Sequence, residues 1–126
     1  MKPRPLFSEH APAPIGPYSQ AIAAGNLIFI SGQIALDPES NRMDGDTIEQ
    51  QTRQAVRNMK ALLDSEGLSI EALVKTTIYL TSIENFAACN RVYERELGGW
   101  KPTRAVVEVR ALPKGALVEI EGIACR

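Results

Sequence analysis

Two segments with the apolar spacing of α-helices interrupt a chain whose other apolar segments are short and rich in β-branched residues. This order restricts the possible folds more than any other feature. The first helical segment opens with Asp46 and Glu49, which form the pattern of a capping box, and Gly67 predicts its end. The second segment follows Ser82, a predicted N-cap, and ends before Gly98. We therefore predict two amphipathic helices.

Six short segments outside the helices have the composition of β-strands. They comprise residues 6–8, 19–23, 27–31, 74–80, 104–109 and 116–124. Gly25 and Asn26 separate the second and third of these segments, and this pair predicts a two-residue hairpin turn. The order β-β-β-α-β-α-β-β predicts an α+β fold, one domain over residues 1–126, in which both helices cover one face of a single mixed sheet.

Charge and cysteine content exclude several classes of protein. The chain has 126 residues and a net charge of −1, and no run of Lys or Arg exceeds two, so we expect no nucleic-acid partner. Cys89, Cys125 and His10 are too few for a structural zinc site or a disulfide framework, and both cysteines are interpreted as reduced packing residues. The N-terminal residues lack a signal-peptide pattern, and no window is apolar enough to span a membrane. We therefore expect a cytoplasmic protein with no metal and no membrane partner.

The last two strands predict a sheet with two unlike faces. One face is expected to be apolar and to suit the helices, and the other to mix apolar with ionisable side chains. The mixed face is predicted to carry Arg104, Val106, Glu108, Leu117, Glu119, Glu121 and Ile123. Because a solvent-exposed face rarely has this much apolar surface, we expect a partner subunit to cover it. The pattern does not determine the number of subunits.

Arg104 and Glu119 are the candidate catalytic residues. The guanidinium of Arg104 is a rigid, charged fork that can bind a carboxylate through two hydrogen bonds, and an interface salt bridge is the alternative role. Glu119, with Glu121 and Glu108 expected nearby, has the character of a general acid or base, because burial and like charges raise a carboxyl pKa. A polar centre in a subunit contact would explain the same carboxylates without catalysis.

Three further residues are candidates for ligand binding or support. Tyr18 follows Gly16 and Pro17, which fix an unusual turn, so its phenol is placed either to cover a ligand or simply to pack. Asn90 interrupts the apolar stripe of the second helix and is expected to hydrogen-bond a loop. Gly32 lies where a strand ends and is expected to permit a close backbone approach.

Several ordered blocks of sequence resemble the RidA/YjgF family. They are IGPYSQ at 15–20, SGQI at 31–34, VKTTIYL at 74–80, the set Phe86, Asn90 and Tyr93, and the long segment 102–121. The resemblance covers nearly the whole chain in the expected order. It implies a chorismate-mutase-like α+β fold and a homotrimer with three clefts between subunits.

The resemblance also implies an activity, the hydrolysis of 2-imino acids formed from enamines such as 2-aminoacrylate. Pyridoxal-phosphate dehydratases release these compounds. The resemblance therefore implies a functional link to these dehydratases, without a stable complex between them and this protein. Arg104 would bind the substrate carboxylate, the backbone of Val106 would contact the imine end, and Glu119 would hold the attacking water. An imine carbon is already electrophilic, so this chemistry requires orientation and proton transfer but no cofactor.

Tyr18, Gly32 and Asn90 would line this pocket or support it. The family often has Cys where this chain has Val106, and activity should survive because the role belongs to the backbone. The connection 98–101 is shorter than expected, and Lys101 replaces a common aromatic residue.

Alternative functions are a regulatory trimer that binds 2-keto acids without turnover, a deaminase of pyrimidine or aromatic catabolism, and the RNA-directed or holdase activity ascribed to relatives. The near-zero net charge argues against RNA.

Overall fold

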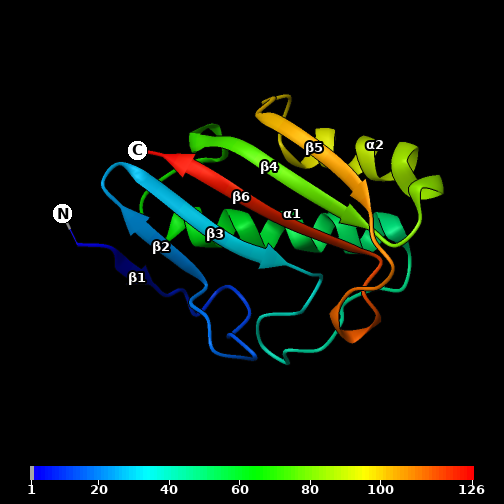
Figure 1. Ribbon diagram of the computed structural model, residues 1–126, viewed down its shortest axis with the longest axis horizontal. Helices are drawn as coiled ribbons and strands as arrows, with labels where there is room; N and C mark the ends of the chain where they lie inside the picture. The colour runs from blue at the N-terminus through cyan, green and yellow to red at the C-terminus, as the bar shows by residue number, and fades with distance from the viewer. Residues whose placement is uncertain (1) are drawn as a thin grey trace.

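The structure is a computed structural model that describes residues 2–126, and in it one six-stranded sheet is covered on one face by two helices (Figure 1). The strands are β1 (Arg4–Leu6), β2 (Ala21–Ala24), β3 (Leu27–Gln33), β4 (Leu73–Leu80), β5 (Thr103–Glu108) and β6 (Val118–Cys125). The helices are α1 (Ile48–Asp64) and α2 (Phe86–Glu96). This order of elements is the predicted one, and the predicted α+β fold is confirmed.

The strand order across the sheet is β1-β2-β3-β6-β4-β5, so the last strand of the chain inserts between β3 and β4. Neighbouring strands are antiparallel except β4 and β5, which are parallel and make the sheet mixed. The predicted hairpin joins β2 to β3, with Ala24 paired to Leu27. Gly25 in its turn has a φ of 61°, a left-handed conformation that glycine adopts readily. β5 lies at the edge of the sheet.

The first helix begins one residue later than its predicted capping box. Thr47, and not Asp46, is the N-cap, because its hydroxyl accepts a hydrogen bond from the Gln50 N–H at 3.2 Å. The Gln50 side chain in turn accepts from the Thr47 N–H at 3.3 Å, which completes a capping box of the same type. Ser82 caps a short 3-10 helix, Ile83–Asn85, that leads directly into α2. Within residues 2–126, no helix is long and apolar enough to cross a membrane.

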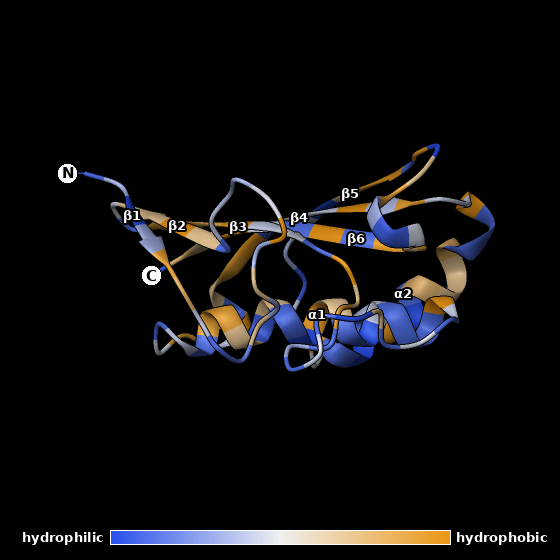
Figure 2. Cartoon of the chain, turned by 90° about the horizontal axis from the view of Figure 1, so that it is seen from below, coloured by the Kyte–Doolittle hydropathy of each residue, from blue (hydrophilic) through white to orange (hydrophobic). Residues whose placement is uncertain are grey.

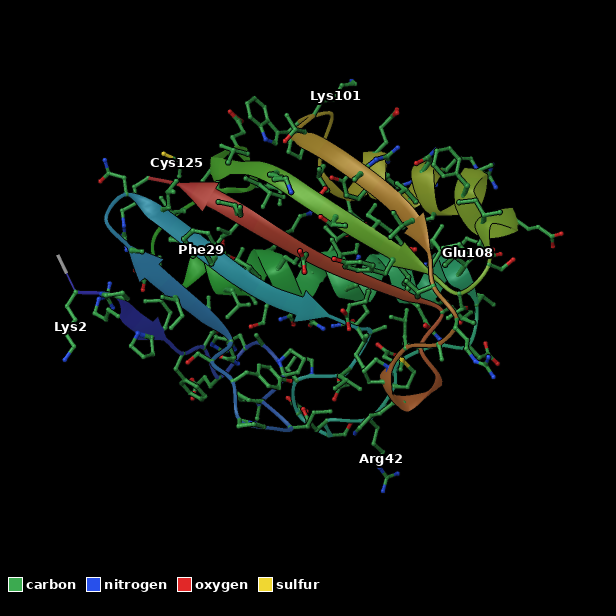
Figure 3. The ribbon with its side chains drawn as sticks, in the orientation of Figure 1. Lys2, Phe29, Arg42, Lys101, Glu108 and Cys125 are labelled. Atoms are coloured by element: carbon green, nitrogen blue, oxygen red, sulfur yellow. The ribbon has the colours of Figure 1, made fainter. Side chains whose placement is uncertain are left out.

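The hydrophobic core lies between the sheet and the helices, and the opposite face of the sheet is open (Figure 2). Along β6 the side chains alternate between buried and half-buried, so Glu119 and Glu121 face away from the helices. On β3 the same open face carries Phe29, whose side chain is substantially exposed (Figure 3). Cys89 packs in the core, as predicted. The mixed character of the open face is therefore confirmed for β6, and β3 adds apolar surface to it.

The edge strand β5 is oriented opposite to the prediction. Its parallel register pairs Arg104 with Thr76 and Val106 with Ile78, and both of these β4 side chains are fully buried on the helix side. Paired residues of neighbouring strands project to the same face, so Arg104, Val106 and Glu108 lie on the helix side of the sheet. The prediction that they share a face with Glu119 is wrong.

Candidate active site

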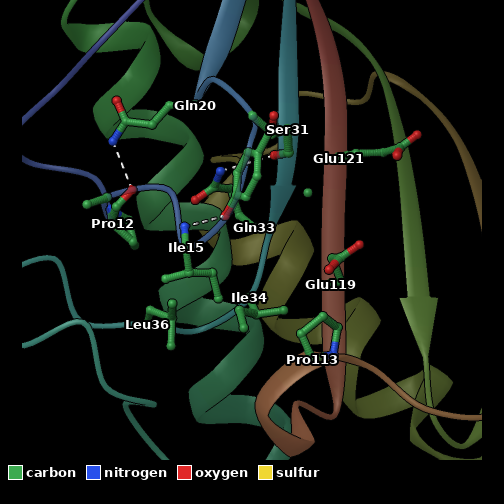
Figure 4. A pocket seen from close by; sticks show the side chains of 13 residues that line it. Pro12, Ile15, Gln20, Ser31, Gln33, Ile34, Leu36, Pro113, Glu119 and Glu121 are labelled. Carbon is green, nitrogen blue, oxygen red and sulfur yellow. Dashed lines mark hydrogen bonds between the residues drawn. The ribbon is translucent and has the colours of Figure 1, made fainter.

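Glu119 borders a hollow on the open face of the sheet, between β6, the end of β3 and two loops (Figure 4). This Glu119 hollow has a volume of about 470 Å³, which suits a small organic ligand. One end is polar and includes Ser31, Gly32, Gln33, Glu119 and Glu121. The other end is an apolar wall formed by Pro12, Ala13, Ile15, Ile34, Leu36 and Pro113.

Gly32 leaves the space that the carboxyl of Glu119 occupies. A β-carbon on Gly32 would lie 2.6 Å from Glu119 Oε2 and 2.7 Å from its Cδ, which is closer than non-bonded atoms approach. The strand is irregular here, because the register of β3 against β6 shifts between Ile30 and Gln33. We predicted a close backbone approach at Gly32, but the group that lies close to it is a side chain, the carboxyl of Glu119.

Tyr18 lies at the rim of the Glu119 hollow and is half exposed. Its hydroxyl accepts a hydrogen bond from the Ile15 N–H at 3.3 Å, which holds the ring against its own loop. The buried side chain of Gln20 anchors this loop. Its Oε1 accepts from the Ser8 N–H at 2.7 Å, and its Nε2 donates to backbone carbonyls between residues 8 and 12. The Tyr18 ring therefore lines the edge of the hollow and is held there by its own loop.

The carboxyl of Glu119 holds its proton more tightly than an ordinary glutamate, so its pKa is raised. Burial raises its pKa above the usual range, and the negative charge of Glu121 adds to this effect. Tyr79 is paired with Glu119 across β4 and β6, and burial also raises the pKa of its phenol. A carboxyl with a raised pKa can take up a proton and release it under mild conditions, which general acid–base catalysis requires.

Arg104 borders a second hollow of about 460 Å³, at the edge of the sheet above α2. Its Nη1 donates a hydrogen bond to Asn90 Oδ1 at 2.7 Å. The guanidinium carbon lies 5.6 Å from the centroid of the Phe86 ring and 5.4 Å from that of Tyr93, distances typical of cation–π contacts. The prediction that Asn90 binds a loop is wrong, because its side chain holds the Arg104 guanidinium instead.

The other polar groups of β5 have separate roles. Val109 N–H donates to the Leu80 carbonyl at 2.8 Å, and backbone groups alternate sides along a strand, so the N–H and C=O of Val106 point to the outer edge. Glu108 does not join the carboxylates of β6. Its Oε1 accepts a hydrogen bond from the Ile83 N–H at 2.8 Å, at the start of the short helix before α2. Glu108 is therefore a capping residue.

Arg104 and Glu119, which the sequence placed on one face of the sheet, border two separate hollows of a single chain. Arg104 and Asn90 lie on the helix side of the sheet edge, where the backbone of Val106 points outward. Glu119 with Gly32 and Tyr18 lies on the open face.

A family model described as Endoribonuclease L-PSP matches residues 8–126. The chain belongs to the endoribonuclease L-PSP family. This is the family that the sequence motifs identified as RidA/YjgF, and a solved relative from Yersinia pestis is assigned to the conserved Rid protein family. That structure has a TM-score of 0.95 to this chain at 43% identity, and the match covers 99% of this chain and 100% of the relative.

Two relatives bear on the activity of the family, one through its name and the other through its bound ligand. The mouse protein called 2-iminobutanoate/2-iminopropanoate deaminase is 41% identical over 119 residues, which cover 94% of this chain and 88% of the mouse protein. The structure of E. coli TdcF with bound serine has a TM-score of 0.92 at 36% identity, over 98% of each chain. Imine deamination is therefore an activity named within the family.

Phe86 and Tyr93 of this L-PSP member contact Arg104, although the sequence indicated them only as part of a family motif and not as candidate site residues. Together with Asn90 they occupy positions i, i+4 and i+7 of α2, which is the spacing of one helix face. That spacing was a usable signal for a shared role. The anchoring role of Gln20 depends on contacts with residues 8–12, which no local pattern indicates.

Proposed function

We propose that this protein hydrolyses 2-imino acids, and the enamines in equilibrium with them, to 2-keto acids and ammonia. The observation that carries the proposal is the carboxyl of Glu119, partly buried over Gly32 in a hollow of about 470 Å³. Its raised pKa suits a group that holds a water molecule and takes up its proton. The name of the mouse relative supports the same activity.

The reaction converts R–C(=NH)–COO⁻ and water into R–C(=O)–COO⁻ and ammonia. Arg104 binds the carboxylate through the guanidinium N–H groups that Asn90 does not use. The backbone of Val106 contacts the imine nitrogen. Glu119 orients the water, accepts one of its protons as the C–O bond forms and passes this proton to the nitrogen, which gives R–C(OH)(NH2)–COO⁻. It then takes the hydroxyl proton and delivers it to the nitrogen as the C–N bond breaks, so that the carbonyl forms and ammonia leaves. Fixing both reactants contributes up to about 7–11 kcal/mol in favourable cases.

We place the reaction between two copies of the chain, because Arg104 and Glu119 of one copy face opposite sides of the sheet. The open face also carries large apolar side chains that suit a subunit contact. Leu27, Phe29 and Val107 are all substantially exposed on it. Burial of this face in an oligomer would remove them from water and bring a second chain to the Glu119 hollow.

A homotrimer would form three such clefts, each combining the Arg104 hollow of one copy with the Glu119 hollow of the next. Tyr18 and Gly32 would then line one wall, and Asn90 would support the other. Enamines of this class are products of pyridoxal-phosphate dehydratases. The protein would therefore act on the products of these dehydratases in the same compartment, the cytoplasm, without forming a stable complex with the dehydratases.

The decisive experiment generates 2-iminopropanoate from serine with a dehydratase and follows pyruvate appearance with and without the protein. We expect acceleration by the wild type. Arg104→Ala should lose substrate affinity and rate together, whereas Glu119→Gln should retain carboxylate binding and lose most of the hydrolysis. If the wild type bound 2-keto acids but accelerated no imine hydrolysis, the protein would be a binding trimer and the proposal would be wrong.

A further inference from the structure

Two elements of the fold, α2 and β4, lie against Arg104 on the helix side of the sheet. From α2, the rings of Phe86 and Tyr93 lie 5.6 and 5.4 Å from its carbon, and Asn90 accepts a hydrogen bond at 2.7 Å. From β4, Thr76 is the residue paired with Arg104 in the parallel register. The guanidinium therefore has a built support on the side that faces the protein.

Thr76 acts on Arg104 through Tyr93. The two hydroxyl oxygens lie 2.7 Å apart, and Thr76 is fully buried while the Tyr93 side chain is nearly so. A buried hydrogen bond of this kind fixes the depth and the tilt of the Tyr93 ring, because breaking it leaves two buried hydroxyls with neither a protein nor a water partner. The Thr76 hydroxyl thus determines where the face of Tyr93 meets the cation.

This support matters because Arg104 is otherwise an exposed side chain at a sheet edge. A long, mobile arginine loses much rotamer freedom when it binds a carboxylate, and that loss weakens binding. Ring faces and an amide acceptor restrict the guanidinium in advance. The hollow of about 460 Å³ beside it leaves room for a ligand to approach.

We infer that Thr76 and Tyr93 are positioning residues, whose buried hydroxyl pair presets the Arg104 guanidinium for the carboxylate of a 2-keto or 2-imino acid. The ring of Phe86 provides the second aromatic contact with the Arg104 guanidinium. The inference rests on the proposed function in that Arg104 is taken as the carboxylate-binding residue. Neither hydroxyl touches the ligand, and their effect passes through the orientation of the arginine.

The test compares Thr76→Val, Tyr93→Phe and the double variant with the wild type. Calorimetry measures the pyruvate affinity, and steady-state kinetics separate KM from kcat with 2-iminopropanoate as the substrate. Each single variant should weaken pyruvate binding about 3- to 10-fold and raise KM by a similar factor, with kcat within about twofold of wild type. The double variant should be no weaker than the worse single one, because both changes remove the same hydrogen bond. Additive losses, or wild-type affinity in folded single variants, would overturn the inference.

Two further variants keep the test independent of folding defects. Phe86 is partly exposed, so Phe86→Leu should fold, lose the cation–π contact and weaken pyruvate binding about 3- to 10-fold, while Phe86→Tyr should restore it. Thr52→Val removes another fully buried hydroxyl, in α1, and should leave pyruvate affinity unchanged. An equal loss in Thr52→Val would indicate a general core effect and overturn the assignment.

The outcomes also separate this inference from the proposed function. If pyruvate binding depends on Arg104, Tyr93 and Thr76 but no imino acid is hydrolysed, the proposed reaction fails and the positioning role stands. If hydrolysis is fast and its KM is insensitive to the Thr76, Tyr93 and Phe86 variants, the positioning role fails and the reaction stands. A wild-type protein that binds no carboxylate overturns both.

Discussion

The carboxyl of Glu119 occupies the space that a side chain at Gly32 would fill. A β-carbon there would lie 2.6 Å from Oε2 and 3.0 Å from Cγ of Glu119. A glutamate side chain is flexible and the strand backbone is not, so any larger residue at position 32 displaces the carboxyl first. The position of the proposed catalytic acid therefore depends on the absence of one methyl group.

Gly32→Ala should slow the hydrolysis of 2-iminopropanoate and lower kcat by at least about tenfold, since a displacement of the order of 1 Å at a reacting group has effects of this size. Pyruvate affinity, which depends on Arg104, should change little. Gly16→Ala is the matched control, because its β-carbon would lie 3.6 Å from the Tyr18 ring, an ordinary contact. Equal turnover rates in the two variants would show that the carboxyl position is unimportant.

Glu119→Gln should stabilise the folded protein while removing activity. Burial raises the pKa of Glu119 in the folded chain above its unfolded value, so the ionised carboxylate destabilises the fold. The gain should be roughly 0.5 kcal/mol at a pH above the folded pKa, a small value because the group is partly solvated. It should disappear well below the unfolded pKa of about 4.3, where the glutamate is protonated in both states and the two proteins should unfold alike. Urea titrations across this pH range measure the difference, and a glutamine variant that is less stable at pH 7 would contradict it.

Glu66 links both ends of the chain to the end of α1. Its Oε1 accepts hydrogen bonds from Arg126 at 2.7 Å and from Arg4 at 3.2 Å. The hydrogen bond from Arg126, aided by Arg4, lowers the pKa of Glu66. Its contribution to stability is therefore complete above the unfolded pKa and is lost as pH falls through the lower folded pKa. Glu66→Gln should reduce the free energy of unfolding by about 1 kcal/mol at pH 7, and by less at pH 3.

The control for this pair of contacts is Glu39→Gln, which changes an exposed glutamate in the loop after β3 and should leave the unfolding free energy nearly unchanged. Added salt should also narrow the gap between wild type and Glu66→Gln, because screening weakens the partly exposed ion pairs. A gap that is independent of both pH and salt would assign the effect to packing and not to charge.

The order of elements and the two faces of β6 could be predicted from the sequence. In these segments the apolar residues recur at one set of positions, and that set defines the buried face. In β6, Val118, Ile120 and Ala124 alternate strictly with polar or half-buried residues, so only one assignment of faces is possible. In α1 and α2 the apolar stripes likewise define one buried face. Periodicity is sufficient wherever one phase is apolar and the other is not.

The facing of β5 could not be predicted in this way. Val106 and Val107 are both apolar and lie in opposite phases, so the pattern fits either orientation of the strand. Only the parallel register with β4 decides it, and that pairing joins residues about 28 positions apart in the chain. The same missing information separated Arg104 from Glu119, because their relation depends on which face the edge strand turns to the helices.

The opposite facing of Arg104 and Glu119 makes a prediction about mixed oligomers. If each cleft takes Arg104 from one copy and Glu119 from the next, chains carrying Arg104→Ala and chains carrying Glu119→Gln should complement each other. In a cyclic trimer assembled at random from equal amounts, about three-quarters of the trimers contain both chains, and each of these has one cleft of three with both groups intact. Co-refolding the two inactive variants should therefore restore about a quarter of wild-type hydrolysis. Each variant refolded alone should stay inactive, and so should a simple mixture of the preformed oligomers. A co-refolded sample as inactive as its parents would place both groups in the same chain, which the register of β4 with its two neighbours does not allow.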